Sequence, residues 1–435
     1  MAKITTTLAK SPQIELQELR TFHAALQQWY RAHGRHHLPW RNTDDPYHIW
    51  LSEVMLQQTQ VATVLARFYH PFLEKFPTIQ ALADAPRDAV MKAWEGLGYY
   101  RRAGFLHHGA QQAVSQGLMQ PMRSAEVARA VKRQGSARET REGGASPPSV
   151  EQLQAIPGIG KNTAHAIAAF AYHQPVAILE ANVKRIVARV FAWENAKETE
   201  LWVGAELLLG TNHLSEASAR KRHAQELERT NMYVSSEHGD DKQIAQRNGL
   251  MHPFDYNQAM MDLGSMVCMP KKPDCTACPA RTLCKGQHAP ERYPAPKPKK
   301  ATPTRALYLL VLEDAAGRLH LEARDAALLG GLYGFPQVPT TTDLRHPMRE
   351  MHAEHWDEIG AVTHIYSHFR LEGRVVHARL RKRMNSPGWF TREEISALPL
   401  SGVDHKVLAL LDGLVSGGNS ATKPPRKAGK SSQRS

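Results

Sequence analysis

The sequence predicts a mostly α-helical N-terminal region followed by a smaller α+β domain, and three observations support this fold class. Apolar residues recur at helical spacing through much of the chain up to about residue 284. A Pro-rich basic stretch interrupts that pattern, and from residue 306 apolar and polar residues alternate as they do in strands. The length of 435 residues fits two or three domains of about 150 residues each.

Composition and charge narrow the class of protein. Hydrophobic residues make up 42% of the chain, which is enough for real cores, and the net charge is +13. An excess of Lys and Arg favours a polyanion as partner, although the basic stretch Lys423 to Arg434 carries part of it in a solvated end. No apolar run is long enough to span a bilayer, and no signal-peptide pattern begins at Met1. We therefore expect a cytoplasmic protein without membrane contact.

The chain begins with a loose leader, residues 1–14, and a helix from Ile14 to Gly34. A loop then carries Leu38-Pro39-Trp40-Arg41, and the pattern predicts one helix from Ile49 to Tyr69. Within that helix Glu53 and Gln57 are four residues apart and would share a face. Such polar residues most often form a solvated face. Amides can also hydrogen-bond or wedge into a base stack, and a carboxylic acid beside them could protonate a base.

Two further helices are predicted around Ile79 to Ala85 and Ala89 to Glu95, followed by Gly-Leu-Gly-Tyr-Tyr-Arg-Arg at 96–102. Tyrosines can stack on or insert between bases while arginines hold phosphates. Core tyrosines beside surface arginines explain this stretch equally well.

A helix-hairpin-helix pattern lies near the middle of the chain. It follows a polar, Gly- and Ser-rich insertion at about 122–148, and Ser149 with Gln152 fits a capping box. Pro157-Gly158-Ile159-Gly160 ends the first helix, and a second helix runs on to Tyr172. The glycines Gly158 and Gly160 let backbone approach a phosphate closely, and the second helix offers its positive N-terminal end.

Glu180 stands just before or at the start of the next predicted helix, whose buried face is formed by Val183, Ile186, Val187 and Val190. An acid at this position is favoured by the helix dipole alone. The functional interpretation is a carboxylate that faces an electron-poor sugar carbon.

All four cysteines follow a second predicted insertion at about 213–250 and form the array C-x6-C-x2-C-x5-C. Their positions are Cys268, Cys275, Cys278 and Cys284. Four thiolates so close in sequence indicate a metal centre rather than a disulfide scaffold. Zinc is the default, and an iron–sulfur cubane is equally compatible with four thiolates.

The remaining chain divides into three parts. Residues 285–305 form a Pro-rich, semi-rigid linker, and residues 415–435 are predicted to be disordered. Between them, residues 306–414 form an α+β domain with a hairpin turn at 314–317, strands at 361–366 and 374–380, and a closing helix from His405 to Leu414.

Several of these stretches together resemble the MutY family of adenine DNA glycosylases. The matching pieces are LPWR at 38–41, WLSEVMLQQTQVATV at 50–64, GLGYYRRA at 96–103, IPGIGKNTA at 156–164, NVKRIVARV at 182–190, NQAMMDLG at 257–264, the cysteine array, GGLYGFPQVP at 330–339 and HIYSHFRLEG at 364–373. They cover most of the chain outside the insertions and the ends.

The resemblance implies a helix-hairpin-helix glycosylase of base excision repair over residues 15–284, built of a six-helix barrel and an iron–sulfur helical domain, and then a Nudix-like domain. The implied substrate is adenine mispaired with 8-oxoguanine in double-stranded DNA, with G·A mispairs also accepted. The cysteines would hold a [4Fe–4S] cluster. The protein would act as a monomer, associated with the nucleoid while it works on DNA.

The resemblance also implies residue roles. Glu53 matches the general acid that protonates adenine N7 and assists water, Gln58 the wedge that enters the vacated stack, and Tyr99 the aromatic that intercalates beside the oxidised guanine. Ser367 and His368 match the loop that senses 8-oxoguanine. Further substrate and DNA contacts are expected from Trp40, Arg41, Leu56, Gln57, Gly158, Gly160, Asn162, Asn182, Lys184 and Gln258.

Two positions bear on the chemistry. Related glycosylase/lyases carry their nucleophilic Lys where this chain has Asn162, with Lys161 one place earlier, which argues against a Schiff-base lyase. The family has Asp where this chain has Glu180, and Gly where it has Ala181. A lesion-binding protein with impaired catalysis is therefore the first alternative. The second is a glycosylase/lyase for oxidised pyrimidines that acts through Lys161 or Lys184.

The C-terminal domain carries only part of a Nudix metal-binding box. Arg349, Glu350 and Glu354 stand in box-like positions, but the full pattern is absent. We expect this domain to recognise the lesion rather than to act as a hydrolase.

Overall fold

The computed structural model describes residues 13–121, 147–210, 250–296, 302–324, 330–351, 353, 355–366 and 369–417. Most of the predicted leader and tail and nearly all of the two predicted insertions lie outside these ranges, as do Glu354, Ser367 and His368. Within the described residues no helix is both long and apolar enough to cross a bilayer.

The chain divides into two compact units. The first comprises Met1–Ala85 and Phe105–Lys299, and the second comprises Pro86–Gly104 and Lys300–Ser435. The segment 86–104, which the sequence placed in the helical domain, packs with the C-terminal part because Glu95 Oε1 accepts a hydrogen bond from Leu400 N (2.9 Å) and Lys92 Nζ donates to Leu398 O (3.0 Å). The other predicted domain borders stay predictions.

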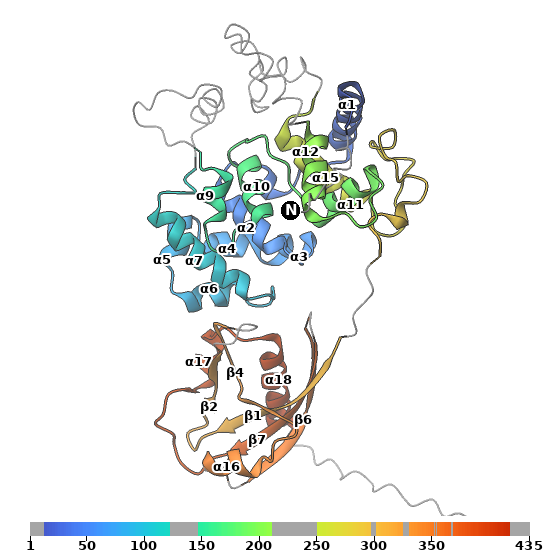
Figure 1. The fold of residues 1–435 in the computed structure, drawn as a ribbon. Helices are drawn as coiled ribbons and strands as arrows, with labels where there is room; N and C mark the ends of the chain where they lie inside the picture. Colours follow the sequence, from blue (N-terminus) through green and yellow to red (C-terminus); the bar gives the residue numbers. More distant parts are fainter. Residues whose placement is uncertain are drawn as a thin grey trace, which may run out of the picture. The chain divides into compact units, whose positions relative to one another are not determined.

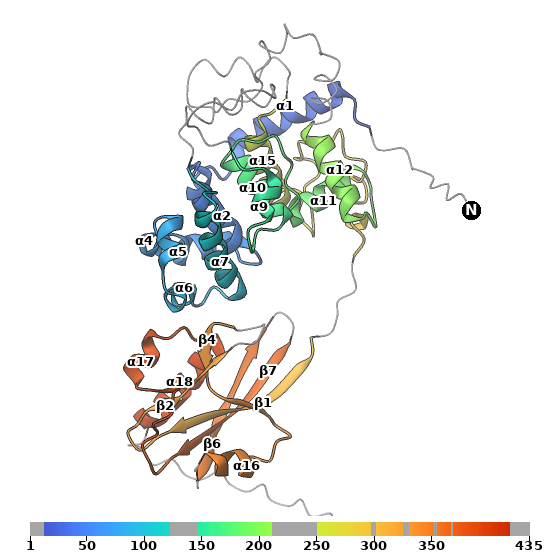
Figure 2. The same ribbon diagram turned by 60° about the vertical axis from the view of Figure 1, so that its left-hand side comes forward.

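The described part of the first unit contains helices and loops (Figures 1 and 2). Its helices are α1 Leu16–His33, η1 Pro39–Arg41, α2 Pro46–Leu56, α3 Val61–Arg67, α4 Tyr69–Lys75, α5 Ile79–Asp84, α7 Arg101–Ser115 (from Phe105 on), α9 Val150–Gln154, α10 Lys161–Phe170, α11 Ala181–Val190, α12 Glu198–Leu209, α15 Pro253–Met266 and η3 Pro290–Arg292. The predicted capping box at α9 is confirmed, because Gln152 N donates to Ser149 Oγ (3.2 Å) and Ser149 N donates to Gln152 Oε1 (2.8 Å).

The prediction of one helix from Ile49 to Tyr69 is wrong. Helix α2 ends at Leu56 because Gln57 leaves the helical region with ψ of 113° and Gln58 takes a positive φ of 58°. A new helix, α3, starts at Val61. Gln57 and Gln58 are therefore exposed in a turn, and Gln57 does not continue the helical face of Glu53.

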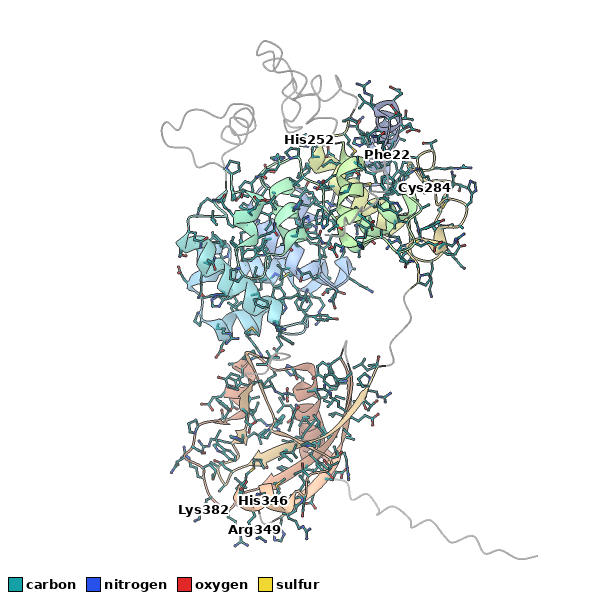
Figure 3. All side chains as sticks on the ribbon, in the orientation of Figure 1. Phe22, His252, Cys284, His346, Arg349 and Lys382 are labelled. Carbon is teal, nitrogen blue, oxygen red and sulfur yellow. The ribbon has the colours of Figure 1, made fainter. Side chains whose placement is uncertain are left out.

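One core of the first unit lies among α1, α11, α12 and α15. Phe22 of α1, labelled in Figure 3, and Leu208 of α12 are fully buried there. Helices α11 and α15 approach closely at Gly264, where an added Cβ would lie 2.5 Å from the Cβ of Asn182. Helix α10 packs against both α2 and α15, so it joins this core to the part of the unit that contains α2.

The second unit is built on a mixed sheet with strand order β6-β7-β1-β2-β8, and β5 also pairs with β1. Its elements are α6 Arg87–Ala93, β1 Thr304–Glu313, β2 Leu319–His320, β3 Glu322–Arg324, β4 Leu332–Gly334, β5 Gln337–Pro339, α16 Arg345–Glu350, β6 Trp356–Ile365, β7 Arg370–Arg379, β8 Trp389–Phe390, α17 Arg392–Ala397 and α18 Gly402–Gly417. The predicted hairpin is confirmed, since Glu313 pairs with Leu319 around a turn in which Gly317 has a φ of 73°.

Strand β1 is buried on both faces of this sheet. Leu309 and Val311 pack on the side covered by α18, whereas Leu310 and Leu312 pack on the side of Met348 in α16. Its parallel pairing with β7 runs over the full length of both strands. The predicted fold class, a helical N-terminal region followed by a Nudix-like α+β domain, is confirmed.

Candidate active site

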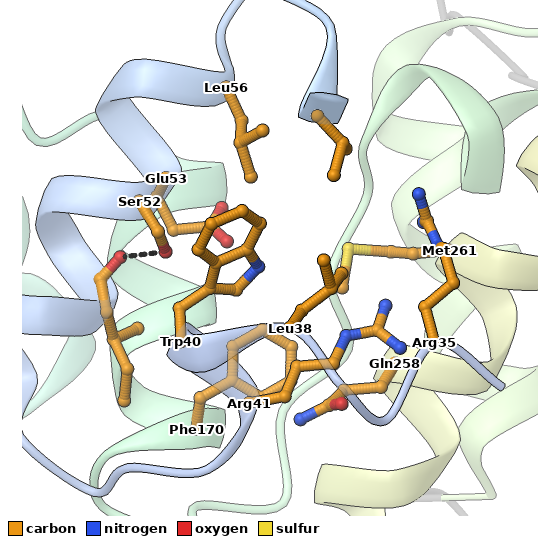
Figure 4. Close-up of a pocket in the computed structure, with 12 residues that line it drawn as sticks. Arg35, Leu38, Trp40, Arg41, Ser52, Glu53, Leu56, Phe170, Gln258 and Met261 are labelled. Carbon is orange, nitrogen blue, oxygen red and sulfur yellow. Dashed lines mark hydrogen bonds between the residues drawn. The ribbon is translucent and has the colours of Figure 1, made fainter. Parts of the chain in front are cut away.

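A pocket of about 450 Å³, counting the space open to solvent, lies within the first unit (Figure 4). Helices η1, α2, α3, α10 and α15 and the loop before η1 contribute its lining. The lining residues are Arg35, Leu38, Trp40, Arg41, Ile49, Ser52, Glu53, Leu56, Val61, Phe170, Gln258 and Met261.

Helix α2 places Glu53 at this pocket. Asp45 caps the helix by accepting from Tyr47 N (2.8 Å), and Pro46 fits the first helical turn, where its missing N–H costs nothing. Most of the other side chains of α2 are buried, including Trp50 and Met55. Glu53 and Leu56 are left on the side that faces the pocket, as Figure 4 shows.

The environment of Glu53 favours its neutral form. Burial and, less strongly, the nearby carboxylate of Glu180 raise the pKa of its carboxyl from 4.5 to about 8, against the opposing charge of Arg41. The side chain is half-buried and opens toward the pocket. Glu53 is therefore a protonated acid at neutral pH, in position to donate a proton to a group in the pocket.

Arg41 is fixed by a buried ion pair. Its Nη1 and Nη2 donate to the two carboxylate oxygens of Asp262 at 2.7 and 2.8 Å, and Arg35 Nε donates to Asp262 Oδ1 at 2.7 Å. Burial alone would raise the pKa of Asp262, but the hydrogen bonds from Arg41 and the bonds and charge of Arg35 outweigh it and lower the pKa. The bidentate geometry holds the guanidinium of Arg41 in one orientation at the pocket wall.

Gln258 and Trp40 complete the polar and aromatic wall. Tyr30 Oη donates to Gln258 Oε1 at 2.9 Å, which fixes the amide of this buried residue at the pocket. Trp40 is buried and packs edge-to-face on Tyr69, with ring centroids 5.1 Å apart. Both side chains are thus held in place without any bound molecule.

Glu180 is the N-cap residue of α11, with an extended backbone (φ −74°, ψ 167°) and no hydrogen bond from its side chain to the helix end. Burial raises the pKa of its carboxyl, and the charge of Lys184 opposes this. Its effect on the pKa of Glu53 places the two carboxyls near each other, although Glu180 is not among the pocket-lining residues.

The hairpin between α9 and α10 has the geometry expected for a phosphate site. Gly158 has a φ of +85°, and a Cβ there would lie 2.7 Å from the Cβ of Phe105. A Cβ at Gly160, the N-cap of α10, would meet nothing within 4 Å, so the backbone at the start of this helix is open. A helix N-terminus of this kind favours anions.

The four cysteines line one hollow beside α11, and Cys284 is labelled in Figure 3. Arg189 Nη1 lies 3.2 Å from Cys268 Sγ. Burial, with a smaller contribution from the neighbouring thiols, raises the pKa of Cys278 to about 12 and that of Cys284 to about 11, although hydrogen bonds from backbone N–H groups oppose the rise. Over the described ranges no three His, Cys, Asp or Glu side chains converge as ligands of a single ion.

Comparison with known proteins agrees with this geometry. The model of a family described as HhH-GPD superfamily base excision DNA repair protein matches residues 51–203, and a NUDIX domain model matches residues 308–410. The chain thus carries an HhH-GPD domain of the base excision DNA repair type, followed by a NUDIX domain. The prediction that it is a DNA N-glycosylase is thereby confirmed.

Several proteins to which the chain is similar are named adenine DNA glycosylase. That of Buchnera aphidicola subsp. Baizongia pistaciae is 28% identical over 329 residues, covering 74% of this chain and 75% of the relative. That of Homo sapiens is 26% identical over 472 residues, covering 92% and 75%. Among solved structures, a thermostable thymine-DNA glycosylase aligns at 22% identity with a TM-score of 0.43, over 62% of this chain and 97% of that one.

Only some of the residues predicted to contact substrate or DNA line the pocket. Trp40, Arg41, Glu53, Leu56 and Gln258 line it. Asn162 instead accepts a hydrogen bond from Leu179 N (3.1 Å), Asn182 accepts from Arg185 Nη2 (2.8 Å), and Lys184 pairs with Glu198 (2.8 Å). None of these three has a pocket-lining position.

Tyr99 belongs to the second unit and is 40% exposed, with a φ of 49°. Arg102 supports its turn, because Nη2 donates to Gly98 O (3.1 Å) and the guanidinium carbon lies 5.3 Å from the centroid of the Tyr99 ring. The ring is thus presented to solvent on a stiffened turn. The roles of Tyr99, Gln57 and Gln58 in DNA binding stay predictions.

Sequence reasoning missed several pocket residues, among them Arg35, Ser52, Phe170 and Met261, and also Asp262 behind Arg41. Residues 258, 261 and 262 follow helical spacing, so the known position of Gln258 could have identified the other two. Phe170 carries no signal in the sequence that separates it from a core residue.

Proposed function

We propose that this DNA N-glycosylase hydrolyses the N-glycosidic bond of adenine mispaired with 8-oxoguanine, and of adenine in G·A mispairs, in double-stranded DNA. The observation that carries the proposal is Glu53 at the wall of the pocket, with its pKa raised to about 8 by burial and by Glu180. Relatives named adenine DNA glycosylase support the choice of base. The adenine must leave the duplex to reach this pocket, as in other enzymes that act on a base.

The two coupled carboxyls have distinct roles in the proposed reaction. Glu53 donates its proton to adenine N7, so the base departs neutral when the C1′–N9 bond breaks. Positive charge then develops on the sugar, and the carboxylate of Glu180 stabilises it. Water adds to C1′, and its proton returns to Glu53. The carboxylate of Glu180 raises the pKa of Glu53, which favours a protonated Glu53 beside an ionised Glu180.

The site favours hydrolysis without lyase activity. A Schiff-base lyase needs a free amine near the sugar. Asn162 holds the position of that amine, and the Nζ of Lys161 makes a cation–π contact 3.9 Å from the centroid of the Trp202 ring. Borohydride trapping of the enzyme on DNA should therefore give no covalent adduct, and an adduct through Lys161 or Lys184 would support the lyase instead.

We propose a [4Fe–4S] cluster at Cys268, Cys275, Cys278 and Cys284. The four thiols line one hollow. Four thiolates are the ligand set of a cubane, and the resemblance of the chain to adenine DNA glycosylases favours this cluster over zinc. Bound to these cysteines, the cluster would tie the loop together. Iron, sulfide and zinc analysis of the purified protein separates the two metals.

The proposed contacts with DNA extend beyond the pocket. Gly158 and Gly160 bind a phosphate, Gln58 enters the vacated stack and Tyr99 intercalates beside the oxidised guanine. Ser367 and His368 would sense 8-oxoguanine. We propose that the enzyme works as a monomer in the cytoplasm, at the nucleoid.

Glu180 stands where the MutY family has Asp. This difference favours a second candidate, a lesion-binding protein that cleaves the bond inefficiently. Purified protein at pH 7 is incubated with 8-oxoguanine·adenine, G·A and matched duplexes, and adenine release is measured under single-turnover conditions. Release from the first two duplexes, lost in Glu53→Gln, supports the proposed function. Tight binding of the mispaired duplex without release supports the second candidate.

A further inference from the structure

The segment Val176–Leu179, which leads into Glu180, belongs to no helix or sheet, and its last three residues are buried. Ile178 and Leu179 are 1% and 0% exposed, so their consecutive backbone N–H groups need partners inside the protein. Those partners are two side-chain amides. Ile178 N donates to Asn257 Oδ1 (3.1 Å), and Leu179 N donates to Asn162 Oδ1 (3.1 Å).

The two amides reach the segment from different helices. Asn162 belongs to the first turn of α10, and Asn257 belongs to α15, where it is 2% exposed. Asn257 Nδ2 also donates to Val176 O (2.9 Å), and His165 Nδ1 of α10 contacts the Ala177 carbonyl at 2.8 Å. Side chains of α10 and α15 therefore supply partners to the backbone of every residue of the segment.

The side chain of the residue that follows is anchored less firmly. The N–H of the adjacent Ala181 and the charge of Lys184 act on the Glu180 carboxylate, but its side chain makes no cap hydrogen bond to α11, and Lys184 itself pairs with Glu198. The place of the Glu180 carboxylate is therefore set by the backbone that delivers it. Small errors of placement at a reacting centre cost large factors in rate.

We propose that Asn162 and Asn257 are positioning residues that set the reach of Glu180 toward the reacting sugar. This inference rests on the proposed function. Asn162 therefore does more than replace the lysine of a lyase. Its side-chain oxygen binds the N–H of Leu179, the residue that precedes Glu180. A Glu is accommodated at position 180 since the segment behind it is fixed from both sides.

The test measures single-turnover adenine release and duplex affinity for Asn162→Ala, with Gln174→Ala as matched control. Gln174 donates its amide to Pro148 O (2.9 Å) at the far end of the same loop, so its removal costs one bond of the same kind. We expect Asn162→Ala to slow release about tenfold with duplex affinity within about twofold, and Gln174→Ala to change neither beyond about twofold.

A double-mutant cycle separates positioning from general loss of structure. In a Glu180→Ala background, where no carboxylate remains to be positioned, Asn162→Ala should slow release by less than about twofold. Asn162→Asp keeps the acceptor oxygen, so hydrogen exchange at Leu179 should stay slow in it and become fast in Asn162→Ala. Asn257→Ala removes the acceptor for Ile178 N and is tested in the same way. If this variant does not fold, Asn257→Asp, which keeps the acceptor, replaces it.

The inference is overturned if Asn162→Ala slows release by the same factor in both backgrounds, or if it does not slow release when Glu180 is present. Absence of release by the wild-type enzyme overturns the proposed function, and this inference with it. The two failures are therefore distinguishable.

Discussion

Glu53 and Glu180 occupy opposite kinds of position in the first unit. Glu53 lies within α2, whose cap and buried neighbours fix it. Glu180 lies at the start of α11 and depends on a segment held by side chains of α10 and α15. The comparison teaches that the acid is placed by local structure, whereas the second carboxylate is placed by tertiary contacts. The two should therefore respond differently to substitution.

Removing the acid should have the largest effect. Glu53→Gln keeps the size of the side chain but has no proton to donate, so adenine release should slow about 10²–10⁴-fold. Single-turnover kinetics on the 8-oxoguanine·adenine duplex measure this. Circular dichroism at the same pH provides the control for folding. A rate within tenfold of wild type would remove Glu53 from its proposed role.

Shortening the second carboxylate tests the other side of the comparison. Glu180→Asp withdraws the charge by about one methylene from a fixed backbone, and we expect release about tenfold slower with unchanged duplex affinity. The same assay beside wild type measures it. A faster rate in Glu180→Asp would instead show that Glu180 impairs this enzyme and would favour the lesion-binding candidate.

The pH dependence should reveal the coupling between the two groups. In the proposed mechanism the acid form of Glu53 is the active one. Because its pKa is about 8, the rate should then fall about tenfold per pH unit above that value. Glu180→Gln removes the like charge that raises this pKa, so the alkaline limb should move to lower pH. An unchanged limb in Glu180→Gln would mean that the two carboxyls do not interact.

The titration of Glu53 also makes the free energy of unfolding depend on pH. The folded protein keeps the Glu53 proton up to about pH 8, whereas the unfolded chain loses it near 4.5. The contribution of Glu53 to the free energy of unfolding therefore falls as pH rises between these values and is constant outside them. Urea denaturation of wild type and Glu53→Gln across this window provides an independent check.

The smallest effect concerns the turn after α2. Gln58 has a φ of 58°, a conformation that costs an L-residue free energy and glycine little. Gln58→Gly should raise the free energy of unfolding by about 1 kcal/mol. The substitution should also slow adenine release if Gln58 fills the space that the flipped adenine leaves in the base stack. Denaturant titration separates the first effect from the second, and a lower stability would contradict it.

The sequence predicts the acid and much of its surroundings because these residues stand in continuous motifs. Glu53 and Leu56 share one stretch, Trp40 and Arg41 share another, and all four line the pocket. The break after Leu56 was not predictable, because Gln57 to Gln60 contains no Gly or Pro and the positive φ of Gln58 depends on the fold around it.

The tertiary part of the site was hidden for a related reason. Asn162 and Asn257 are far apart in sequence, and nothing in their own neighbourhoods indicates that both bind one short segment. Phe170 has the periodicity of a core residue and becomes a pocket wall only because α10 packs against α2 and α15. Local pattern identifies the chemistry of side chains, whereas their convergence requires the packing of helices.

The close contact between Gly264 and Asn182 leads to a genetic prediction. Its missing Cβ lets α15 lie against Asn182 of α11, so one contact sets the spacing between the helix that begins after Glu180 and the helix that carries Gln258 and Asp262. Alanine there would force these helices apart. A screen for strains with raised spontaneous mutation rates should therefore recover substitutions at Gly264, although this residue lines neither the pocket nor the cysteine hollow.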